Sequence, residues 1–523
     1  MTAATGTVIA GPRSRPASPT GVVFLLTALL GSCTVGGADI IMVGYPDQEI
    51  AVLAAVLGLV VLAPAVASMR FQARRLDPMH PLFFAAWAFF LPEFVVAAFL
   101  ILSGQLDSVA SWVLQDPTAA RIAALRMAIV GSLGLSAGYL LPVGRRIAAR
   151  LPQPKTFENS TALARPAAVL LLLFGGMGVI WAFRNGGFGY QFNLEIPMFG
   201  AMFAFLSQLL VVGQGIVWFS FFRQGRGWWL LALLALGLVL TTVAASGSRG
   251  ALFSALVLLL ACYLYAQDRL WIRRLWKWVI VLLAGLWVGV VFGTSFRWIK
   301  IEQLGRSESM SAEEVAAVAR KSASEMGSTP LRETVKFGWD RLVERLDGLT
   351  SLGVIVANSG ALKRDEMALG IDHNIARDFV NSLVPRFLWP DKPTVGIAEQ
   401  IGGLYYGTEH TSPAVTYMGD LYRNYGWGGV FPGMFLIGLV LRAIYAWLIE
   451  GHALTGVRVG IYFITTTAVQ YEGLYSTYFP TLFRVLAVGL AGVGAAFVTA
   501  RLFLGSPPGK QGRDASKGFR PGM

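Results

Sequence analysis

Imidazole side chains are the first candidates for chemistry in this sequence, because histidine can take up and release a proton near neutral pH. The four histidines of the chain are His80, His373, His410 and His452. His373 and His410 lie in the one long hydrophilic segment, whereas the other two lie at the ends of apolar segments. His373 stands between Asp372 and Asn374, which could orient its ring. We therefore expect His373 to act as a general base, the alternative being an ordinary surface histidine.

Arginines form the second group of candidates, since the planar guanidinium fork binds the oxygens of a phosphate or diphosphate without a metal. Arg249 lies in a short turn between two apolar segments, and Arg341 and Arg345 share one face of a helix. Further basic residues of the hydrophilic segment are Arg297, Arg377, Arg386 and Lys392. Each of these residues could instead form an ordinary ion pair, and Arg249 could reach lipid headgroups.

The sequence does not indicate a metal site. Neither His373 nor His410 has a second ligand at the spacing that metal sites use. The two cysteines, Cys33 and Cys262, both lie in apolar segments, where cysteine usually serves as a small apolar side chain. We expect no metal and no cofactor.

These candidate residues belong to a chain whose composition is that of a membrane protein. Hydrophobic residues make up 55% of it and charged residues 14%, whereas soluble domains carry about a quarter charged residues. Apolar runs of about twenty residues, long enough to cross about 30 Å of hydrocarbon, recur along the chain. We predict an all-α polytopic membrane protein with about twelve transmembrane helices, near residues 20–44, 50–68, 82–103, 121–142, 166–184, 197–222, 227–245, 250–267, 276–295, 428–449, 459–479 and 481–503.

Basic residues recur at alternate connections between these helices, and positively charged connections stay on the cytoplasmic side of a membrane. The basic connections contain Arg70, Arg74, Arg75, Arg145, Arg146, Arg150, Arg223, Arg226, Arg269, Arg273, Arg274 and Lys277, and the C-terminal tail is also basic. Both termini are therefore predicted to be cytoplasmic. The net charge of +13 follows from this distribution, so we expect no nucleic acid partner.

The large hydrophilic segment then lies on the extracytoplasmic side. We divide the chain into a cytoplasmic N-terminal segment (1–19), helices one to nine (20–295), the large loop (296–427), helices ten to twelve (428–503) and a basic cytoplasmic tail (504–523). Ser311 and Glu314 form a capping box, which predicts a helix from Ser311 to Met326, and Pro330 begins a second helix that reaches about Asp347. For the rest of the loop we expect ordered turns without an independent hydrophobic core.

Three features of the sequence point to a known family. They are the turn Ser248–Gly250, the large loop before the last few helices, and two motifs within that loop, Pro385–Pro393 and Gly419–Gly428. With these features the chain resembles the O-antigen polymerase or oligosaccharide repeat-unit polymerase family, which is similar in organisation to O-antigen ligases. The general architecture covers most of the chain, whereas the motifs cover only about forty residues.

The resemblance implies a metal-independent glycosyltransferase of the bacterial inner membrane that transfers a glycan from undecaprenyl diphosphate to a sugar hydroxyl at the periplasmic face. The arginines expected to neutralise the leaving diphosphate are Arg249, Arg297, Arg341, Arg345, Arg377 and Arg386. The expected base is His373, with Asp372 and Asp420 as alternatives. Further expected substrate contacts are Ser248, Lys392, His410 and Tyr422. The expected partners are lipid-linked glycans, membrane lipids, a flippase and a regulator of chain length.

Two other functions fit parts of this pattern. A ligase or a protein O-oligosaccharyltransferase would use the same donor with a different acceptor, and the sequence separates these enzymes poorly from a polymerase. A flippase or another transporter would also have about twelve helices, but transporters place their polar groups near the middle of the membrane and have related halves. Here the polar residues are concentrated in the large loop, and this favours an enzyme.

The charge distribution predicts that residues 297–427 face the periplasm. Single cysteines introduced into this segment of a cysteine-free variant should react with a membrane-impermeant thiol reagent in whole cells. A cysteine placed between Arg269 and Lys277 should react only after the cells are permeabilised. Protection of several loop positions, together with labelling of the Arg269–Lys277 connection, would contradict the topology.

Overall fold

The structure is a computed structural model of the chain. It describes residues 19–41, 44–73, 77–154, 161–184, 200–246, 249–267, 272–304, 310–328, 330–384, 388–389, 397–408 and 414–504. Every regular element in these ranges is a helix, and none of the described residues lies in a strand.

Ten helices of the described chain are long and apolar enough to cross a membrane. They span Pro19–Gly37, Pro46–Phe71, Pro81–Leu102, Pro117–Leu140, Leu163–Arg184, Leu206–Gln224, Arg226–Val243, Trp276–Gln303, Trp427–Leu448 and Tyr475–Phe503. A shorter apolar helix covers Gly250–Ala266. The protein is therefore an all-α polytopic membrane protein, as the composition predicts.

The helix predicted over residues 459–479 is shorter in the structure. It is α20 (Gly456–Thr467), and its 12 residues are too few to cross a bilayer. A turn over residues 468–473 separates it from α21 (Tyr475–Leu504). The polar side chains of Gln470 and Glu472 lie in this turn, where both are exposed.

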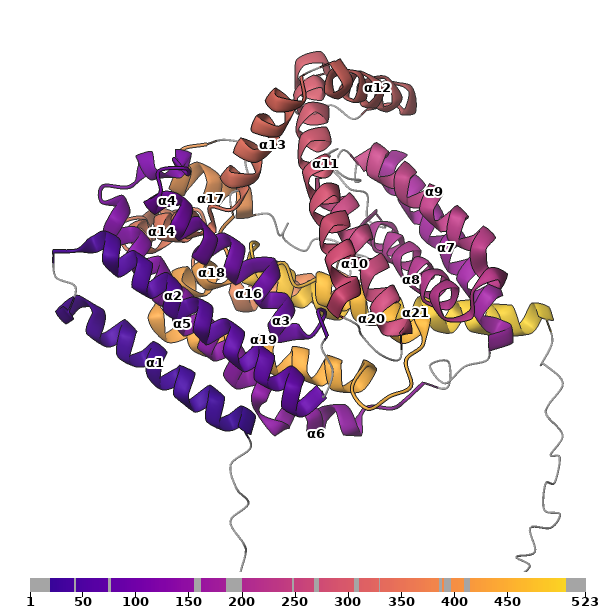
Figure 1. Ribbon diagram of the computed structural model, residues 1–523, viewed down its shortest axis with the longest axis horizontal. Coiled ribbons are helices and arrows are strands. Elements are labelled where there is room, and N and C mark those ends of the chain that lie inside the picture. The colour runs from indigo at the N-terminus through magenta and orange to yellow at the C-terminus, as the bar shows by residue number, and fades with distance from the viewer. Residues whose placement is uncertain are drawn as a thin grey trace, which may run out of the picture.

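Most of the helices outside the large loop form two groups (Figure 1). The first bundle consists of α1 (Pro19–Ile41), α2 (Pro46–Ala67), α5 (Pro117–Leu140), α6 (Pro142–Arg150) and α19 (Trp427–Leu448). The second bundle consists of α7 (Thr161–Arg184), α8 (Gly200–Gln224), α9 (Trp229–Ser246), α10 (Arg249–Ala266), α11 (Ile272–Leu304), α20 and α21. Between α2 and α5 run α3 (Pro81–Ala85), the π-helical segment η2 (Ala86–Val96) and α4 (Ala97–Leu102), which form one continuous span that packs against α2.

Glycines bring two helices of the first bundle into close contact. A Cβ atom on Gly138 of α5 would overlap the carbonyl oxygen of Phe435 on α19, and one on Gly438 of α19 would overlap the carbonyl oxygen of Leu135 on α5. Inside a lipid phase the hydrophobic effect does not drive helices together, so helix association depends on close packing. Small residues such as glycine allow the two backbones to approach closely enough for this packing.

The large loop is helical and begins as a continuation of α11. It contains α12 (Ala312–Ser328), α13 (Leu331–Arg345), α14 (Gly348–Asn358), α15 (Lys363–Ala368), α16 (Ile375–Leu383), α17 (Ile397–Tyr406) and α18 (Tyr417–Tyr425). The predicted capping box is confirmed, since the Ser311 amide donates to Glu314 Oε2 at 2.7 Å and the Glu314 amide donates to Ser311 Oγ at 3.3 Å. Figure 1 shows α12 and α13 towards the far end of α11, with α14 and α17 over the end of the first bundle, while α16 packs against α21.

The second part of the loop shares a hydrophobic core with the membrane domain. The buried side chains of this core are Leu114, Ala120, Val354, Ile355, Ile371, Ile401, Tyr405, Val415 and Leu474. Leu114, Ala120 and Leu474 lie outside the loop, so this core is completed by residues of the membrane domain. The expectation of ordered turns for this part of the loop was wrong, because it forms the short helices α14 to α18. The α12 region packs separately, with Met310, Val315 and Val318 buried against Phe296 and Ile299 of α11.

The contact between α5 and α19 predicts that Gly138→Ala lowers the thermal stability of the protein in detergent. The new methyl group must displace the backbone of α19, and overpacking of this kind costs about 1–3 kcal/mol. Gly237→Ala on α9 is the matched control, because a Cβ atom there meets nothing within 4 Å. Equal unfolding temperatures for the two variants would contradict the close contact.

Candidate functional site

The main polar feature of the loop is a buried guanidinium. Arg423 on α18 has no exposed side-chain surface, and neither have the carboxylates that pair with it. Its Nη1 donates to Glu366 Oε1 at 3.1 Å and to the carbonyl of Ile371 at 2.6 Å. Its Nη2 donates to Asp420 Oδ1 at 2.9 Å and to Asn374 Oδ1 at 2.6 Å. Burial alone lowers the pKa of Arg423, but Asp420 and Glu366 raise it above the ordinary value.

Further hydrogen bonds extend this arrangement, which we call the Arg423 network. Its side chains are Glu366, Asn374, Asp378, Tyr405, Asp420, Arg423 and Asn424. Asn374 Nδ2 donates to Asp378 Oδ2 at 2.6 Å, and Tyr405 donates to Glu366 Oε1 at 2.9 Å. The amide of Ser476 donates to Asp420 Oδ2 at 2.9 Å. The network therefore connects four loop helices to the first turn of α21.

His373 lies at the surface of this network. Its backbone is left-handed, with φ of 45°, and its side chain is exposed. The carbonyl of Ile371 accepts from Arg423, and the amide of Ile375 donates to Asn424 Oδ1 at 3.3 Å. The turn is thus held on both sides of His373. Strained backbone of this kind costs about 1–3 kcal/mol and is found preferentially at functional sites.

The two neighbours of His373, which were expected to orient its ring, lie in different environments. Asn374 is buried, and its side-chain amide belongs to the Arg423 network. Asp372 is half-buried. The imidazole ring of His373 lies instead near Tyr425, with 6.1 Å between the ring centroids. The other two expected residues of this region are Asp420, which is buried in its ion pair, and Tyr422, which is half-buried with its ring against Trp427.

The described arginines of the predicted diphosphate site lie on three helices, α11, α13 and α16. Arg341 pairs with Glu344 at 2.8 Å, and Arg345 is exposed on the same helix. Arg377 donates to Asp378 Oδ1 at 3.2 Å and to the carbonyl of Gly370 at 3.0 Å. Arg297 is half-buried on α11. The side chain of Arg249 and the residues Ser248, Arg386, Lys392 and His410 lie outside the part of the chain that the structure describes.

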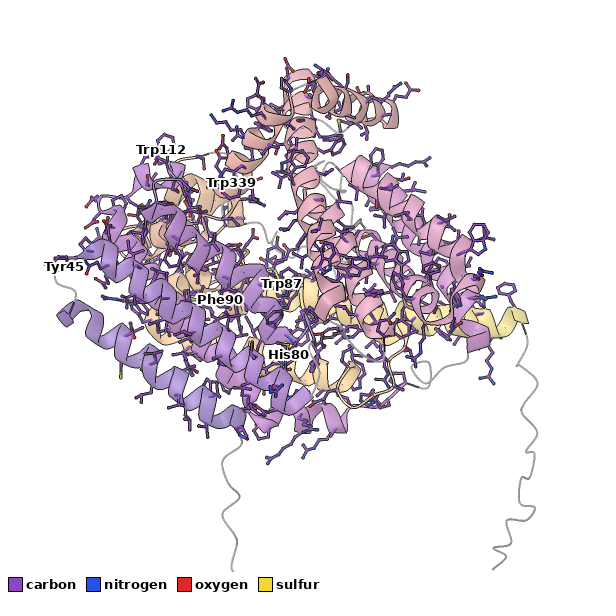
Figure 2. All side chains as sticks on the ribbon, in the orientation of Figure 1. Tyr45, His80, Trp87, Phe90, Trp112 and Trp339 are labelled. Carbon is purple, nitrogen blue, oxygen red and sulfur yellow. The ribbon has the colours of Figure 1, made fainter. Side chains whose placement is uncertain are left out.

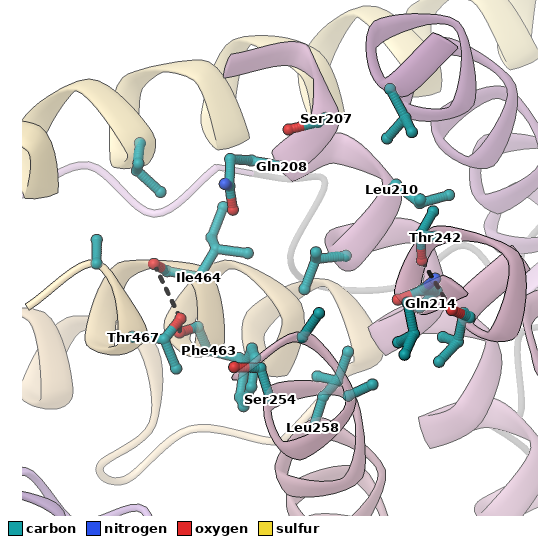
Figure 3. Close-up of a pocket in the computed structure, with 18 of the residues that line it drawn as sticks. Ser207, Gln208, Leu210, Gln214, Thr242, Ser254, Leu258, Phe463, Ile464 and Thr467 are labelled. Carbon is teal, nitrogen blue, oxygen red and sulfur yellow. Dashed lines mark hydrogen bonds between the residues drawn. The ribbon is translucent and has the colours of Figure 1, made fainter. Parts of the chain in front are cut away.

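A cavity of about 350 Å³ lies inside the second bundle (Figure 3). Residues of α7, α8, α9, α10, α20 and α21 and of the turn after α20 line it. Its polar lining residues are Ser207, Gln208, Gln214, Thr242, Ser254, Thr467, Gln470, Tyr478 and Thr481. Ala251 and Ser254 belong to the first turns of α10, which begins at Arg249. Arg484 of α21 donates to Thr481 Oγ1 at 2.7 Å, so a guanidinium adjoins the lining.

A second buried polar group lies on the side away from the loop, near His80 (Figure 2). Asp77 accepts hydrogen bonds from Tyr265 of α10 at 2.8 Å and from Tyr445 of α19 at 2.9 Å, so it connects the two bundles. His80 Nε2 lies 2.9 Å from the hydroxyl of Tyr139. Burial, together with nearby Arg442, lowers the pKa of His80 to about 3, and its ring is therefore neutral at physiological pH.

Sequence reasoning missed the cavity and most of the Arg423 network. Asp420 and Arg423 lie three residues apart in the motif Gly419–Gly428, but Glu366 is distant in sequence and carried no signal. The signal for the cavity was weak, because each helix contributes only one or a few polar residues to it. Among the described residues, no group of three or more His, Cys, Asp or Glu side chains is placed to hold a metal ion.

The Arg423 network predicts that Arg423→Met strongly destabilises the protein. Loss of the guanidinium leaves the carboxylates of Glu366 and Asp420 buried without a cation, which costs about 3–5 kcal/mol. Arg341→Met is the control, because its ion pair with Glu344 is solvent-exposed and contributes about 0–1 kcal/mol. Unfolding curves in detergent measure the difference, and similar losses in both variants would contradict the role of the network.

Comparison with known proteins places the chain in a family. A family described as a domain of unknown function, DUF8712, matches residues 185–483. No curated protein and no solved structure matches the chain. The matched region contains the start of α10 at Arg249, the large loop with the Arg423 network, and most of the residues that line the cavity. Because the match covers more than half of the sequence, the chain belongs to the DUF8712 family.

Proposed function

We propose that this protein polymerises oligosaccharide repeat units linked to undecaprenyl diphosphate, at the periplasmic face of the bacterial inner membrane. The observation that carries the proposal is the position of the cavity. It lies among membrane helices, and α10, which contributes to its lining, begins at Arg249. A cavity among membrane helices, with the guanidinium of Arg484 beside its lining, suits a donor that combines a lipid, a diphosphate and a glycan.

One helix connects this cavity to the loop. The amide of Ser476 in the first turn of α21 binds Asp420 of the Arg423 network. Tyr478 and Thr481, in the next turn, line the cavity. The end of the cavity formed by these residues is therefore close to the loop. A donor held there would have its diphosphate near the side of the membrane on which the loop lies.

In the proposed reaction the hydroxyl of an acceptor sugar attacks the anomeric carbon of the lipid-linked donor. A new C–O bond forms, the bond between the anomeric carbon and the diphosphate oxygen breaks, and undecaprenyl diphosphate leaves. His373 takes the hydroxyl proton, and the turn that carries it is held by the Arg423 network. Arg249 neutralises the charge that develops on the leaving diphosphate, with Arg484 as a further guanidinium beside the cavity.

The burial of Asp420 favours a structural role for this residue over that of the base. Its carboxylate has no exposed surface and binds Arg423, Asn424 and the amide of Ser476. Asp372 is half-buried and remains the alternative base. Tyr422, Lys392, His410, Ser248 and the remaining loop arginines are proposed to contact the substrates.

A flippase is the second candidate, because the cavity lies among membrane helices. Glycans from a strain lacking the protein distinguish the functions. Loss of a polymerase leaves single repeat units on the final carrier, and loss of a ligase leaves polymer on the lipid carrier. Loss of a flippase leaves lipid-linked single units on the cytoplasmic side.

The proposed chemistry predicts the behaviour of variants in a proteoliposome assay that measures the length of glycans made from lipid-linked repeat units. Arg249→Ala should abolish transfer, and Arg249→Lys should restore little, because lysine keeps the charge but loses the planar fork. His373→Ala should reduce turnover by about 10²- to 10⁴-fold, the usual contribution of a general base, with donor binding nearly unchanged.

Matched controls lie on the opposite side of the membrane domain. Arg226→Ala and His452→Ala remove the same side-chain types at the ends of other helices and should leave transfer unchanged. Near wild-type polymerisation by Arg249→Ala, at a normal level of folded protein, would exclude the donor role. Near wild-type polymerisation by His373→Ala would transfer the role of base to Asp372.

A further inference from the structure

The cavity in the second bundle is polar but uncharged. Its polar lining consists of amides and hydroxyls, and no Asp, Glu, Lys, Arg or His belongs to the described lining. A diphosphate inside it would therefore find no cation in the lining itself, and an anion that leaves water without a cationic partner is unstable. Uncharged ligands with many hydroxyl groups do not carry this cost.

Gln214 of α8 indicates that a ligand completes the cavity. Gln214 is 4% exposed and lines the cavity. Its side-chain amide makes no hydrogen bond to the described part of the protein. An unpaired amide is unfavourable inside a membrane domain, where such groups are usually satisfied by a partner. Figure 3 shows Gln208 and Gln214 from the same helix among the residues around the cavity.

The hydroxyl groups of the lining can also bind a ligand. Thr242 donates to the carbonyl of Val239 at 2.9 Å, and Thr467 donates to the carbonyl of Phe463 at 2.8 Å. Each hydroxyl is thus used as a donor, but its oxygen can still accept a hydrogen bond. The glutamine amides supply both donors and acceptors. This combination matches sugar hydroxyls, which donate and accept.

The remaining wall of the cavity is apolar. Leu210, Val239, Leu258 and Ile464 contribute to it. A sugar ring has polar edges and less polar faces formed by C–H groups, so both kinds of lining can contact it. The volume of about 350 Å³ is at the lower end of the range of small-molecule sites, which is roughly 300–1,000 Å³.

We propose that this cavity binds the uncharged sugar rings nearest to the diphosphate of the lipid-linked glycan, and that Gln214 is a recognition residue for them. The diphosphate itself stays outside the cavity, next to the arginines. The proposal rests on the proposed function for the identity of the lipid carrier, but the recognition of sugar by the cavity follows from its lining. The membrane domain would then select the glycan that the enzyme uses.

The test is a binding measurement with purified full-length protein in lipid nanodiscs. The probes are citronellyl diphosphate, citronellyl diphosphate-linked glucose and citronellyl diphosphate-linked N-acetylglucosamine. At least one sugar-bearing probe should bind more tightly than the sugar-free probe. Gln214→Leu should weaken the binding of that probe by about three- to tenfold, the effect of one lost hydrogen bond, and leave the sugar-free probe unchanged.

Stability separates a binding role from a structural one. Because the Gln214 amide has no partner among the described residues, Gln214→Leu should keep or raise the unfolding temperature while it weakens sugar binding. A matched pair on α9 gives an independent control. Thr242 lines the cavity whereas its neighbour Thr241 is exposed, and both hydroxyls donate to a backbone carbonyl of their own helix. Thr242→Val should weaken the binding of the sugar-bearing probe and Thr241→Val should not.

Three outcomes decide between the hypotheses. Equal affinity for the sugar-free and both sugar-bearing probes, or equal weakening of all probes by Gln214→Leu, overturns the sugar site. Polymerisation that is insensitive to Gln214→Leu and Thr242→Val also overturns it, while the proposed function stands. Sugar binding that depends on Gln214, in a protein that makes no polymer, supports the site and excludes the polymerase function.

Discussion

The burial of the Arg423 guanidinium is the interaction on which the large loop depends. A charge removed from water is stable only when ion pairs and hydrogen bonds replace its hydration. Glu366 and Asp420 supply the opposite charges, and the side chain of Asn374 and the carbonyl of Ile371 supply further acceptors. These groups come from different short helices and turns of the loop, so all of them must be in place at once. The same hydrogen bonds hold the exposed turn at His373, because Ile371 on one side binds Arg423 and Ile375 on the other side binds Asn424.

Glycines allow close helix packing in both bundles, and the second bundle also contains a cavity. In the first bundle, glycines allow the backbones of α5 and α19 to touch, and no space remains at the contact. In the second bundle, polar side chains such as Gln214 surround a cavity. Asp77, held by tyrosines from both bundles, joins them on the side away from the loop. On the loop side, α21 both binds the network and lines the cavity, which couples two regions with different chemistry.

Local signals predicted the local structure well. Apolar runs located the membrane helices, and the capping box of Ser311 and Glu314 located the start of α12, because both depend on neighbouring residues. The end of α20 was predicted wrongly, because residues 459–479 are mostly apolar and a turn of a few residues around Gln470 does not interrupt that pattern clearly. Contacts between distant segments carry no such signal. The ion pair of Glu366 with Arg423 and the assembly of the cavity from six helices are therefore properties of the fold.

The shared hydrophobic core determines whether the loop can be expressed as a separate fragment. Val354 and Ile371 of the loop are buried together with Leu114 and Leu474, which belong to connections of the membrane domain. A soluble fragment that contained only the loop would lack these side chains and would expose the apolar surface that they cover. Antibodies against the folded loop, crystals of it and redesigned versions of it therefore require the whole membrane protein.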